Sequence, residues 1–482
     1  MDESSIGDLA KSLESMRSLR LVDRIRELAN QNASGERTAL SNDQGLALSY
    51  GRVLDKIEDF RLSSFVEANE LVILILSRDI DSILTYLGVL NSGASLIVAP
   101  EDMSAIAVMQ LGATYRANSL LASASEIKRL GMVPTKTWGD IGRVNMKGAS
   151  KAPILQQQVL MSTSGSSGSP KQVRLTEGHL AANARDIATA LGIVSNDVAL
   201  TQLPLSYSYG LSVLNSHLWA GAHVVCSSIG VVSSGFAQFL EAQSISSLVG
   251  VPFTYQMYTK IGIFERLPKS VRYFTQAGGA MKPEVVSEVA TSLRKSSVEF
   301  FSMYGQTEAT ARIAILHSSL ALDYPDSVGL PVPSGSVEIG TENHPDELVY
   351  FGPNTMLGYS INREDLGKPD ACAGYLQTGD LAEIRDGLIF IKGRIKRIAK
   401  INGMRVNLAE IEQSLSKFSA TAVVEHSNKL LVVSEAPQEK LVELGEFLKG
   451  LGFQDRDFKL TRVDELPKLH SGKVDLAALS EG

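Results

Sequence analysis

Short apolar runs alternate with segments of helical periodicity through the first half of the chain. The runs are Leu71–Leu76, Ala94–Ala99, Ala222–Ser227 and Ile245–Val251. A helical pattern from Ile83 to Leu90 separates the first two. Runs of this kind are typical of strands that are buried on both faces. Their alternation with helices predicts an α/β fold in which helices cover both faces of largely parallel sheets.

The pattern changes near Val337. Hairpin-like strands follow at Glu347–Gly352 and Leu388–Gly393, and beyond them basic helices mix with short strands. A chain of 482 residues is too long for one ordinary hydrophobic core. We therefore predict two domains, residues 1–393 and residues 394–482, with a boundary near Gly393–Lys396.

Charge and cysteine content exclude several classes of protein. The formal net charge of −7 argues against nucleic acid or an anionic membrane surface as a partner. Cys226 and Cys372 are the only cysteines, so neither a disulfide framework nor a cysteine zinc site is predicted. The acidic start of the sequence does not match a signal peptide, and no apolar run is long enough for a membrane span. We expect a cytoplasmic protein.

The stretch Ser162–Thr176 reads STSGSSGSPKQVRLT and has no apolar residue before its lysine. Gly/Ser tracts form flexible linkers in many proteins. This tract lies between an apolar run and an amphipathic segment, where a linker is unusual. It is therefore interpreted as a loop that binds phosphates through backbone N–H groups, hydroxyls and one cation. Its spacing does not match a Walker loop, and the chain has no dinucleotide-binding glycine pattern after a strand.

The loop resembles the phosphate loop of the adenylate-forming enzymes, the superfamily of acyl-CoA synthetases, luciferases and peptide-synthetase adenylation domains. Their pattern is T-S-G-[ST]-[ST]-G-x-P-K-G, from which only Gln172 departs. The residues that this resemblance assigns to nucleotide binding are Thr163, Ser164, Gly165, Ser166, Ser167, Gly168 and Lys171. It implies that Thr163 and Lys171 also act in catalysis.

A second segment, SMYGQTEAT, resembles the Y-G-x-T-E signature of the same superfamily. Alone, it also fits a turn at a strand end followed by a helix start. Its tyrosine offers a ring for adenine, its threonine a hydroxyl for a phosphate, and Glu308 a catalytic carboxylate that can hold Mg2+. The residues added to the nucleotide site are Ser302, Met303, Tyr304, Gly305 and Thr307.

The C-terminal part of the chain contains further matches. TGDLAEI (378–384) resembles the ribose-binding element and assigns Asp380 to the ribose, although a Gly-Asp pair is commonly only a turn. The segment 393–412 resembles the family's hinge region, although a basic stretch of this kind also fits a solvated surface. The resemblance implies ribose or phosphate binding by Arg394, a hinge at Lys396, and a thioester-forming face with Lys400 and Gly403.

LPKLHSGKVDLAAL (466–479) resembles the segment that carries the family's catalytic lysine, which assigns catalysis and nucleotide binding to Lys473. The sequence departs from the family pattern at Ala399 and Leu476, where isoleucine and arginine are usual.

The resemblance assigns Tyr207, Ser208, Gly278 and Gly279 to the acid pocket, with Gly279 and Ala280 also bordering the nucleotide. Peptide-synthetase domains hold the ammonium of an amino acid with an aspartate, and the equivalent residue here is Ser208. A buried ammonium without a carboxylate is costly, so an amino acid substrate is disfavoured. The glycines leave space for an apolar tail or ring. We predict a medium-length aliphatic or aromatic carboxylic acid.

Since these matches follow the family's order, the sequence is identified as a member of the adenylate-forming superfamily. This implies a large N-terminal domain of stacked mixed α/β sheets plus a distorted β-barrel, and a small mobile α+β C-terminal domain. The implied activity is ATP-dependent formation of an acyl-adenylate with release of pyrophosphate, then transfer to a thiol, most often that of coenzyme A (CoA). A phosphopantetheine arm on an acyl carrier protein or an amine is an alternative acceptor. A nucleotide- and acid-binding sensor without catalysis is the alternative of another class, against which Lys473 and Glu308 argue.

Overall fold

A computed structural model describes residues 15–31, 35–148, 154–162, 171–401, 404–451, 453–469 and 473–480. These residues form two compact units. The first contains the described residues up to Ser336 together with Phe351–Leu376. The second contains Val337–Tyr350 and the described residues from Gln377 onward.

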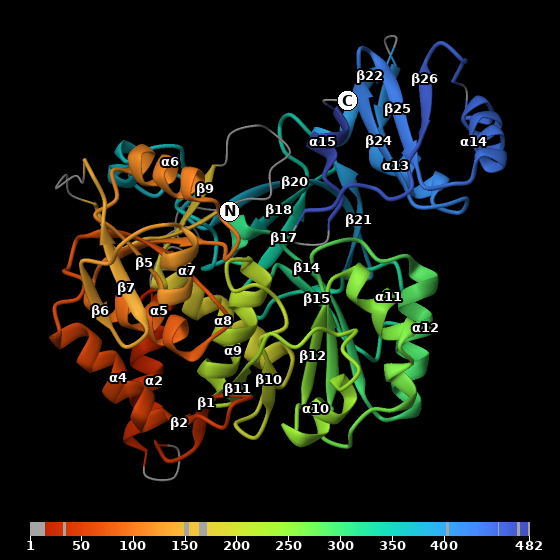
Figure 1. Ribbon diagram of the computed structural model, residues 1–482. Coiled ribbons are helices and arrows are strands. Elements are labelled where there is room, and N and C mark those ends of the chain that lie inside the picture. Colours follow the sequence, from red (N-terminus) through yellow and green to blue (C-terminus); the bar gives the residue numbers. More distant parts are fainter. Residues whose placement is uncertain are drawn as a thin grey trace, which may run out of the picture. The chain divides into compact units, whose positions relative to one another are not determined.

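The first unit is built on two sheets (Figure 1). The nine-stranded sheet has the order β16 (Leu330–Pro331), β15 (Ala314–Leu316), β14 (Glu299–Tyr304), β13 (Tyr273–Gln276), β12 (Ser247–Gly250), β10 (Val198–Leu200), β11 (His223–Cys226), β1 (Thr38–Asn42) and β2 (Ala47–Ser49). Its strands are parallel from β14 to β1, while β15, β16 and β2 pair antiparallel at the edges.

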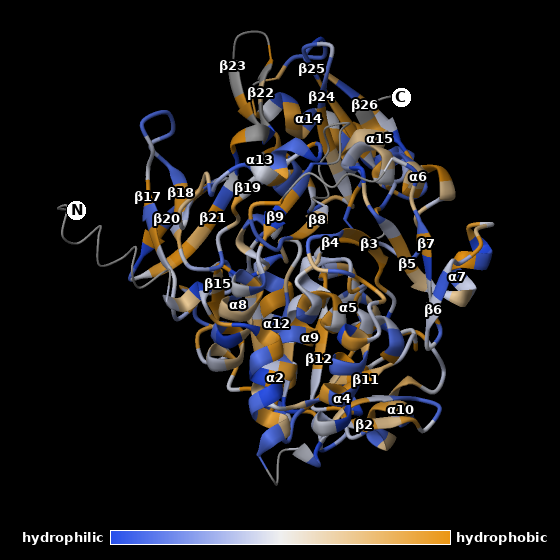
Figure 2. Ribbon diagram, turned by 90° about the vertical axis from the view of Figure 1, so that its left-hand side faces the viewer, coloured by the Kyte–Doolittle hydropathy of each residue, from blue (hydrophilic) through white to orange (hydrophobic). Residues whose placement is uncertain are grey.

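The eight-stranded sheet has the order β19 (Gly358–Ser360), β9 (Gln172–Leu175), β8 (Val159–Ser162), β4 (Ser95–Ala99), β3 (Leu71–Ile75), β5 (Ser119–Ser123), β7 (Ile141–Asn145) and β6 (Lys136–Trp138). The four strands from β8 to β5 are parallel. Figure 2 shows hydrophobic residues along β3, β4 and β12, as expected for strands that are covered on both faces.

Helices lie between and outside the two sheets. They are α2 (Leu21–Asn30), α4 (Tyr50–Leu62), α5 (Ile80–Ser92), α6 (Ala105–Tyr115), α7 (Ala124–Arg129), α8 (Glu177–Ala190), α9 (Ser208–Ala220), α10 (Phe236–Ala242), α11 (Pro252–Lys260) and α12 (Pro283–Lys295). Helix α5 contacts β4 and β5 of one sheet and β1 of the other, and α9 packs on α8 as well as on β10 and β11. In Figure 1, α5, α8 and α9 form the layer between the sheets, whereas α11 and α12 cover the outer face of the larger one.

The second unit begins with a four-stranded sheet in the order β17 (Ser336–Ile339), β18 (Glu347–Phe351), β20 (Tyr375–Arg385) and β21 (Leu388–Arg394). The register of β20 on β21 shifts between Leu381 and Ala382, and an irregularity of this kind bends a sheet. This curled sheet corresponds to the predicted distorted barrel.

The remaining elements of the second unit are α+β. They are η4 (Ile395–Arg397), β22 (Ile398–Ile401), β23 (Met404–Asn407), α13 (Leu408–Leu415), β24 (Thr421–His426), β25 (Lys429–Ser434), α14 (Gln438–Gly450), β26 (Phe458–Arg462) and α15 (Leu476–Ser480). Strands β24, β25 and β26 form one sheet, and Leu430, Val432, Leu444 and Leu448 are fully buried in its core with α14.

The stacked α/β sheets and the curled sheet confirm the predicted fold class. The predicted boundary near Gly393–Lys396 falls inside the second unit, at the end of β21 and the start of η4. The division into residues 1–393 and 394–482 therefore stays a prediction. None of the helices in the described ranges combines the length and the apolar content needed to cross a bilayer.

A buried arginine fixes the edge of the smaller sheet. Arg174 of β9 is only 1% exposed. Its Nη1 donates to the carbonyls of Asp365 (2.9 Å) and Lys368 (2.8 Å), and its Nη2 to those of Leu357 (2.9 Å) and Pro369 (3.2 Å). These bonds hold the segment around β19 against the strand that follows the phosphate-loop sequence.

We expect Arg174→Met to lower the free energy of unfolding by about 3 kcal/mol or more, because buried carbonyls then lose their donors. Urea unfolding followed by circular dichroism measures the change. Arg52→Met is the control, since Arg52 is exposed and lies 3.6 Å from Asp55; it should shift stability by less than about 0.5 kcal/mol. Equal stability of the two variants would contradict the role of Arg174.

Candidate functional site

The predicted phosphate loop connects the antiparallel strands β8 and β9. Ser162 pairs with Gln172 where the loop begins and ends. Gln172, the one departure from the family pattern, is buried and donates from Nε2 to the Ser162 Oγ at 3.0 Å. Its side chain therefore ties the two strands together at the base of the loop. The predicted residues that lie outside the described ranges are Thr163, Ser164, Gly165, Ser166, Ser167 and Gly168.

Tyr359 brings the predicted metal ligand and the predicted loop lysine to one place. Its hydroxyl donates to Oε1 of Glu308 at 2.8 Å, and the Nζ of Lys171 lies 4.6 Å from its ring centroid. Burial raises the pKa of Tyr359, and the Glu308 carboxylate raises it further. The phenol therefore remains a hydrogen-bond donor at neutral pH. The sequence matches gave no role to Tyr359, which is the last residue of GPNTMLGY (352–359).

The loop after β14 is held by a second residue of that segment. Asn354 is fully buried and donates from Nδ2 to the carbonyls of Ala309 (2.7 Å) and Arg312 (3.0 Å). Gly305 is required on the other side of the loop, because a Cβ there would lie 1.9 Å from the Ala311 oxygen. The path of this loop, and with it the position of the carboxylate of the Y-G-x-T-E match, is therefore fixed by segments far apart in sequence.

The predicted acid pocket and nucleotide site meet at the start of α9. The Oγ of Ser208 lies 3.3 Å from the Oγ1 of Thr307. Gly278 has φ +83°, and a Cβ there would lie 2.3 Å from the Tyr207 hydroxyl oxygen, so glycine allows this tyrosine its place. Burial raises the pKa of Tyr207. The Tyr207 hydroxyl therefore lies directly against Gly278, so these two predicted pocket residues are in contact.

A glutamine that the sequence matches did not assign supports the glycine segment. Gln276 ends β13, and its Oε1 accepts a hydrogen bond from the Ser302 hydroxyl at 3.2 Å. Its Nε2 donates to the Gly279 carbonyl at 2.7 Å. Ser302 is thereby connected to Gly279, and Ala280 follows at the exposed end of the segment.

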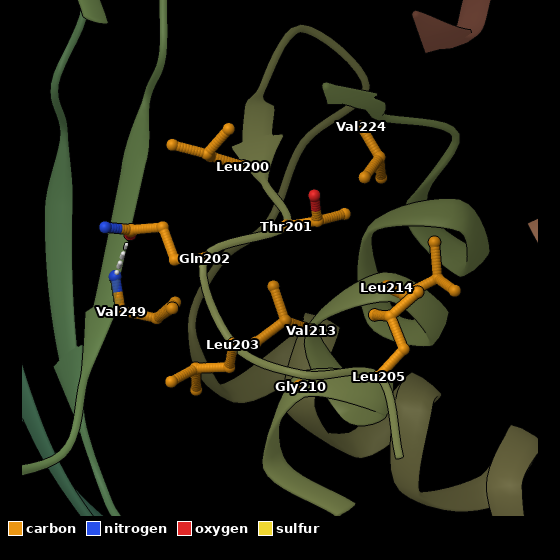
Figure 3. Close-up of a pocket in the computed structure, with 10 residues that line it drawn as sticks. All are labelled: Leu200, Thr201, Gln202, Leu203, Leu205, Gly210, Val213, Leu214, Val224 and Val249. Carbon is orange, nitrogen blue, oxygen red and sulfur yellow. Dashed lines mark hydrogen bonds between the residues drawn. The ribbon is translucent and has the colours of Figure 1, made fainter. Parts of the chain in front are cut away.

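One small cavity and one closely packed depression, which has no room for a water molecule, lie on opposite faces of α9. The residues that line the first, drawn in Figure 3, are Leu200, Thr201, Gln202, Leu203, Leu205, Gly210, Val213, Leu214, Val224 and Val249. It is apolar and has no titratable group, so catalysis is not expected there. Those of the second are Met161, Leu180, Asn183, Ala184, Ser208, Leu211, Ser212, Asn215 and Thr310. The second contains the predicted pocket residue Ser208 and a set of hydroxyl and amide groups.

Met303 and Tyr304 end β14 in the first unit, and the predicted residues that remain belong to the second unit. Asp380 is 1% exposed, and its Oδ1 lies 2.6 Å from the Nε of Arg394, so the two predicted ribose residues do lie together. Lys473 lies in a loop in which the Leu469 N–H donates to its carbonyl at 2.7 Å. Lys396 belongs to η4 and Lys400 to β22. Gly403 lies outside the described residues.

The described residues fit a Mg2+ ion that is held mainly by the phosphates of the substrate. Among the described residues, no group of three His, Cys, Asp or Glu side chains could hold a metal ion. Magnesium is commonly held by one or two carboxylates together with substrate phosphates. Glu308, half-buried next to the base of the predicted phosphate loop, fits that pattern.

This combination of fold and site is that of a nucleotide-binding enzyme with a separate C-terminal unit. The profile of the AMP-binding enzyme family matches residues 27–360, and the chain belongs to that family. A 2-succinylbenzoate–CoA ligase from Bacillus velezensis is 29% identical over 273 residues, which cover 55% of this chain and 54% of that protein. A feruloyl-CoA synthase from an Amycolatopsis species is 26% identical over 348 residues, 66% of this chain and 68% of that one. The chain thus aligns with about half the length of the former relative.

Solved structures share the fold. The o-succinylbenzoate CoA synthetase of Bacillus subtilis, in complex with its acyl-adenylate intermediate, superimposes with a TM-score of 0.75 at 21% identity, covering 95% of this chain and 98% of that one. A benzoate CoA ligase from Burkholderia xenovorans gives a TM-score of 0.75 at 21% identity, with 96% and 100% covered. These likenesses confirm the adenylate-forming fold.

We expect Tyr359→Phe to weaken binding of Mg–ATP about threefold to tenfold, the range of one ordinary hydrogen bond, because Tyr359 is partly exposed. The variant removes the donor to Glu308 and keeps the ring beneath Lys171. Titration calorimetry with Mg–ATP and with metal-free ATP separates the two effects, since only the former depends on the carboxylate. Tyr375→Phe, at a ring that packs 5.4 Å from Phe351, is the control. Equal loss for metal-free ATP would contradict a role through Glu308.

Proposed function

We propose that this protein is an ATP-dependent, AMP-forming acid–thiol ligase. It converts a small carboxylic acid into an acyl-adenylate and then transfers the acyl group to CoA. The observation that carries this proposal is the cluster of Lys171, Tyr359 and Glu308 at the base of a loop with a phosphate-binding sequence. A cation for phosphates and a carboxylate for their metal are thus adjacent in one unit.

In the first half-reaction an oxygen of the substrate carboxylate attacks the α-phosphorus, and the bond to the β-phosphate oxygen breaks to release pyrophosphate. Two anions approach each other, so the protein must mainly position them and offset their repulsion. The residues Thr163 to Gly168 and Lys171 surround the β- and γ-phosphates. Glu308 would hold Mg2+, and the bound ion would supply positive charge against the leaving pyrophosphate. Lys473 bridges the carboxylate and the α-phosphate.

In the second half-reaction the sulfur of a thiolate attacks the acyl carbonyl carbon, and AMP leaves. Residues 394–482 include Lys473 and also the stretch that contains Lys400 and Gly403. We propose that residues 394–482 pivot at Lys396, so that they present first Lys473 and then the Lys400 face. Asp380 and Arg394 hold the ribose throughout.

CoA is the proposed acceptor because the relatives include a 2-succinylbenzoate–CoA ligase and a feruloyl-CoA synthase. A phosphopantetheine carrier protein or an amine is the alternative acceptor. A sensor without catalysis is disfavoured, because it would not need Lys473. We propose a cytoplasmic location for this activity.

Lys473→Ala should reduce acid-dependent ATP–pyrophosphate exchange by at least ~10²-fold, because a positioned charge at the developing bond is lost. Thioester formation from preformed acyl-adenylate should fall much less. Lys468→Ala, at an exposed lysine that pairs with Glu465 at 2.6 Å, is the matched control in the same loop. If both half-reactions fall equally, Lys473 has a different role.

A medium-length aliphatic or aromatic acid should drive exchange better than acetate or any proteinogenic amino acid. Discrimination against amino acids should be at least ~10²-fold, because their ammonium would be buried without a carboxylate. Ser208→Asp supplies that carboxylate and should reduce the difference in exchange rate between the preferred acid and amino acids. Robust exchange of the unmodified protein with an amino acid would falsify this assignment.

A further inference from the structure

Arg312 is a buried cation for which the described residues supply no anion. It is 2% exposed. Its Nε donates to the sulfur of Met303 at 3.3 Å, and its guanidinium lies 4.1 Å from the ring centroid of Tyr209. No carboxylate of the described residues forms an ion pair with it. Burial accordingly lowers its pKa, with only Tyr209 and Tyr207 acting in the other direction.

Two other buried arginines of the first unit, Arg143 and Arg174, have oxygen acceptors for their terminal nitrogens. Arg143 pairs with Glu70, its Nη2 lying 2.7 Å from Oε1. Arg174 donates to backbone carbonyls from both terminal nitrogens. An arginine remains protonated in proteins, so a guanidinium without such partners is costly unless a ligand provides them.

The backbone holds Arg312 in place by strained geometry. The two preceding residues, Thr310 and Ala311, have φ values of 59° and 130°, in a region that residues other than glycine rarely adopt. The Arg312 carbonyl accepts hydrogen bonds from Nδ2 of Asn183 at 3.1 Å and of Asn354 at 3.0 Å. Such strain clusters at ligand sites, where the surrounding structure enforces it.

Contacts connect Arg312 to the predicted acid pocket. Tyr209, on which it stacks, is fixed by a hydrogen bond from its hydroxyl to the Thr275 carbonyl at 2.8 Å. The ring of Tyr207 lies edge-on to that of Tyr209, with centroids 6.2 Å apart, and its hydroxyl lies against Gly278. Ser208 lies between the two tyrosines in sequence. Only the ring of Tyr209 therefore separates the Arg312 guanidinium from Tyr207, which is assigned to the acid pocket.

We propose that Arg312 binds a second carboxylate of the substrate, so that the acid activated here is a dicarboxylic acid. The inference rests on the proposed adenylation and names its substrate class. One carboxylate is adenylated, and the other accepts hydrogen bonds from the terminal nitrogens of Arg312. The planar guanidinium matches a carboxylate with two parallel N–H···O bonds, which gives orientation as well as affinity.

The test compares matched acids in the exchange assay. Succinate, glutarate and isophthalate are each paired with the keto acid in which a methyl ketone replaces one carboxylate. The wild type should prefer at least one dicarboxylate over its partner by ~10²-fold in kcat/KM, since a site built for an anion rejects an analogue that leaves it unpaired. Arg312→Met should abolish that preference and leave exchange with the keto acids within about threefold of wild type.

Two further variants make the result specific. Arg312→Lys keeps the charge without the fork and should lower kcat/KM for the preferred dicarboxylate about tenfold, leaving its keto partner unchanged. Arg385→Met removes an exposed arginine that stacks 3.8 Å from the Phe390 ring and should change neither preference. If Arg312→Met does not fold, Arg312→Lys and the comparison of paired acids in the wild type still test whether Arg312 binds a second carboxylate.

The outcomes separate this inference from the proposed function. Two outcomes overturn the inference and leave the proposed function intact. One is exchange with monocarboxylic acids without a preference for any dicarboxylate, and the other is a preference that remains in Arg312→Met. If no acid drives exchange, the proposed function fails, and thermal stabilisation by the same acids takes over as the readout. Stabilisation by a dicarboxylate that is lost in Arg312→Met supports the site, and equal shifts with the paired acids overturn it.

Discussion

The bonds from Asn354 to the loop after β14 are the contacts on which the first unit's site depends. One fully buried amide joins the carbonyls of Ala309 and Arg312. Between these two carbonyls the chain adopts unfavourable φ values, which isolated peptides would avoid. Glu308 precedes this stretch and Arg312 ends it. The same amide therefore sets the position of a carboxylate on one side and of a cation on the other.

Much of the framework followed from the sequence because its signals are local. The apolar runs at Leu71–Leu76 and Ala94–Ala99 became β3 and β4, since strands buried on both faces cannot contain many polar residues. The motif matches also assigned roles to residues whose chemistry is explicit in their side chains, such as Glu308, and these roles stay predictions. Asp380 was assigned to the ribose and Arg394 to the ribose or a phosphate, and the two side chains do form an ion pair.

The supporting residues could not be identified in the same way. Tyr359 contacts Glu308 across 51 positions of sequence, and Asn354 contacts Arg312 across 42. Tyrosine and asparagine are both common in loops. Which residues they contact depends on how the segment around β19 packs at the edge of the smaller sheet. Gln172 was noted as a departure from the family pattern, but its bond to Ser162 depends on the register of β8 and β9. Periodicity and spacing do not contain this information.

The two cations of the proposed site, Lys171 and Arg312, differ in a way that suits the order of the proposed reaction. Lys171 is exposed and lies over a tyrosine ring, so its flexible ammonium can follow phosphates as they arrive and leave. Arg312 is buried, stacked and tied through its backbone, so it cannot move with a departing group. In the proposed reaction, pyrophosphate leaves after the first half-reaction, whereas the acyl group must stay until the thiol attacks. A mobile cation on the phosphates and a fixed one on the acid would release the first product while retaining the second.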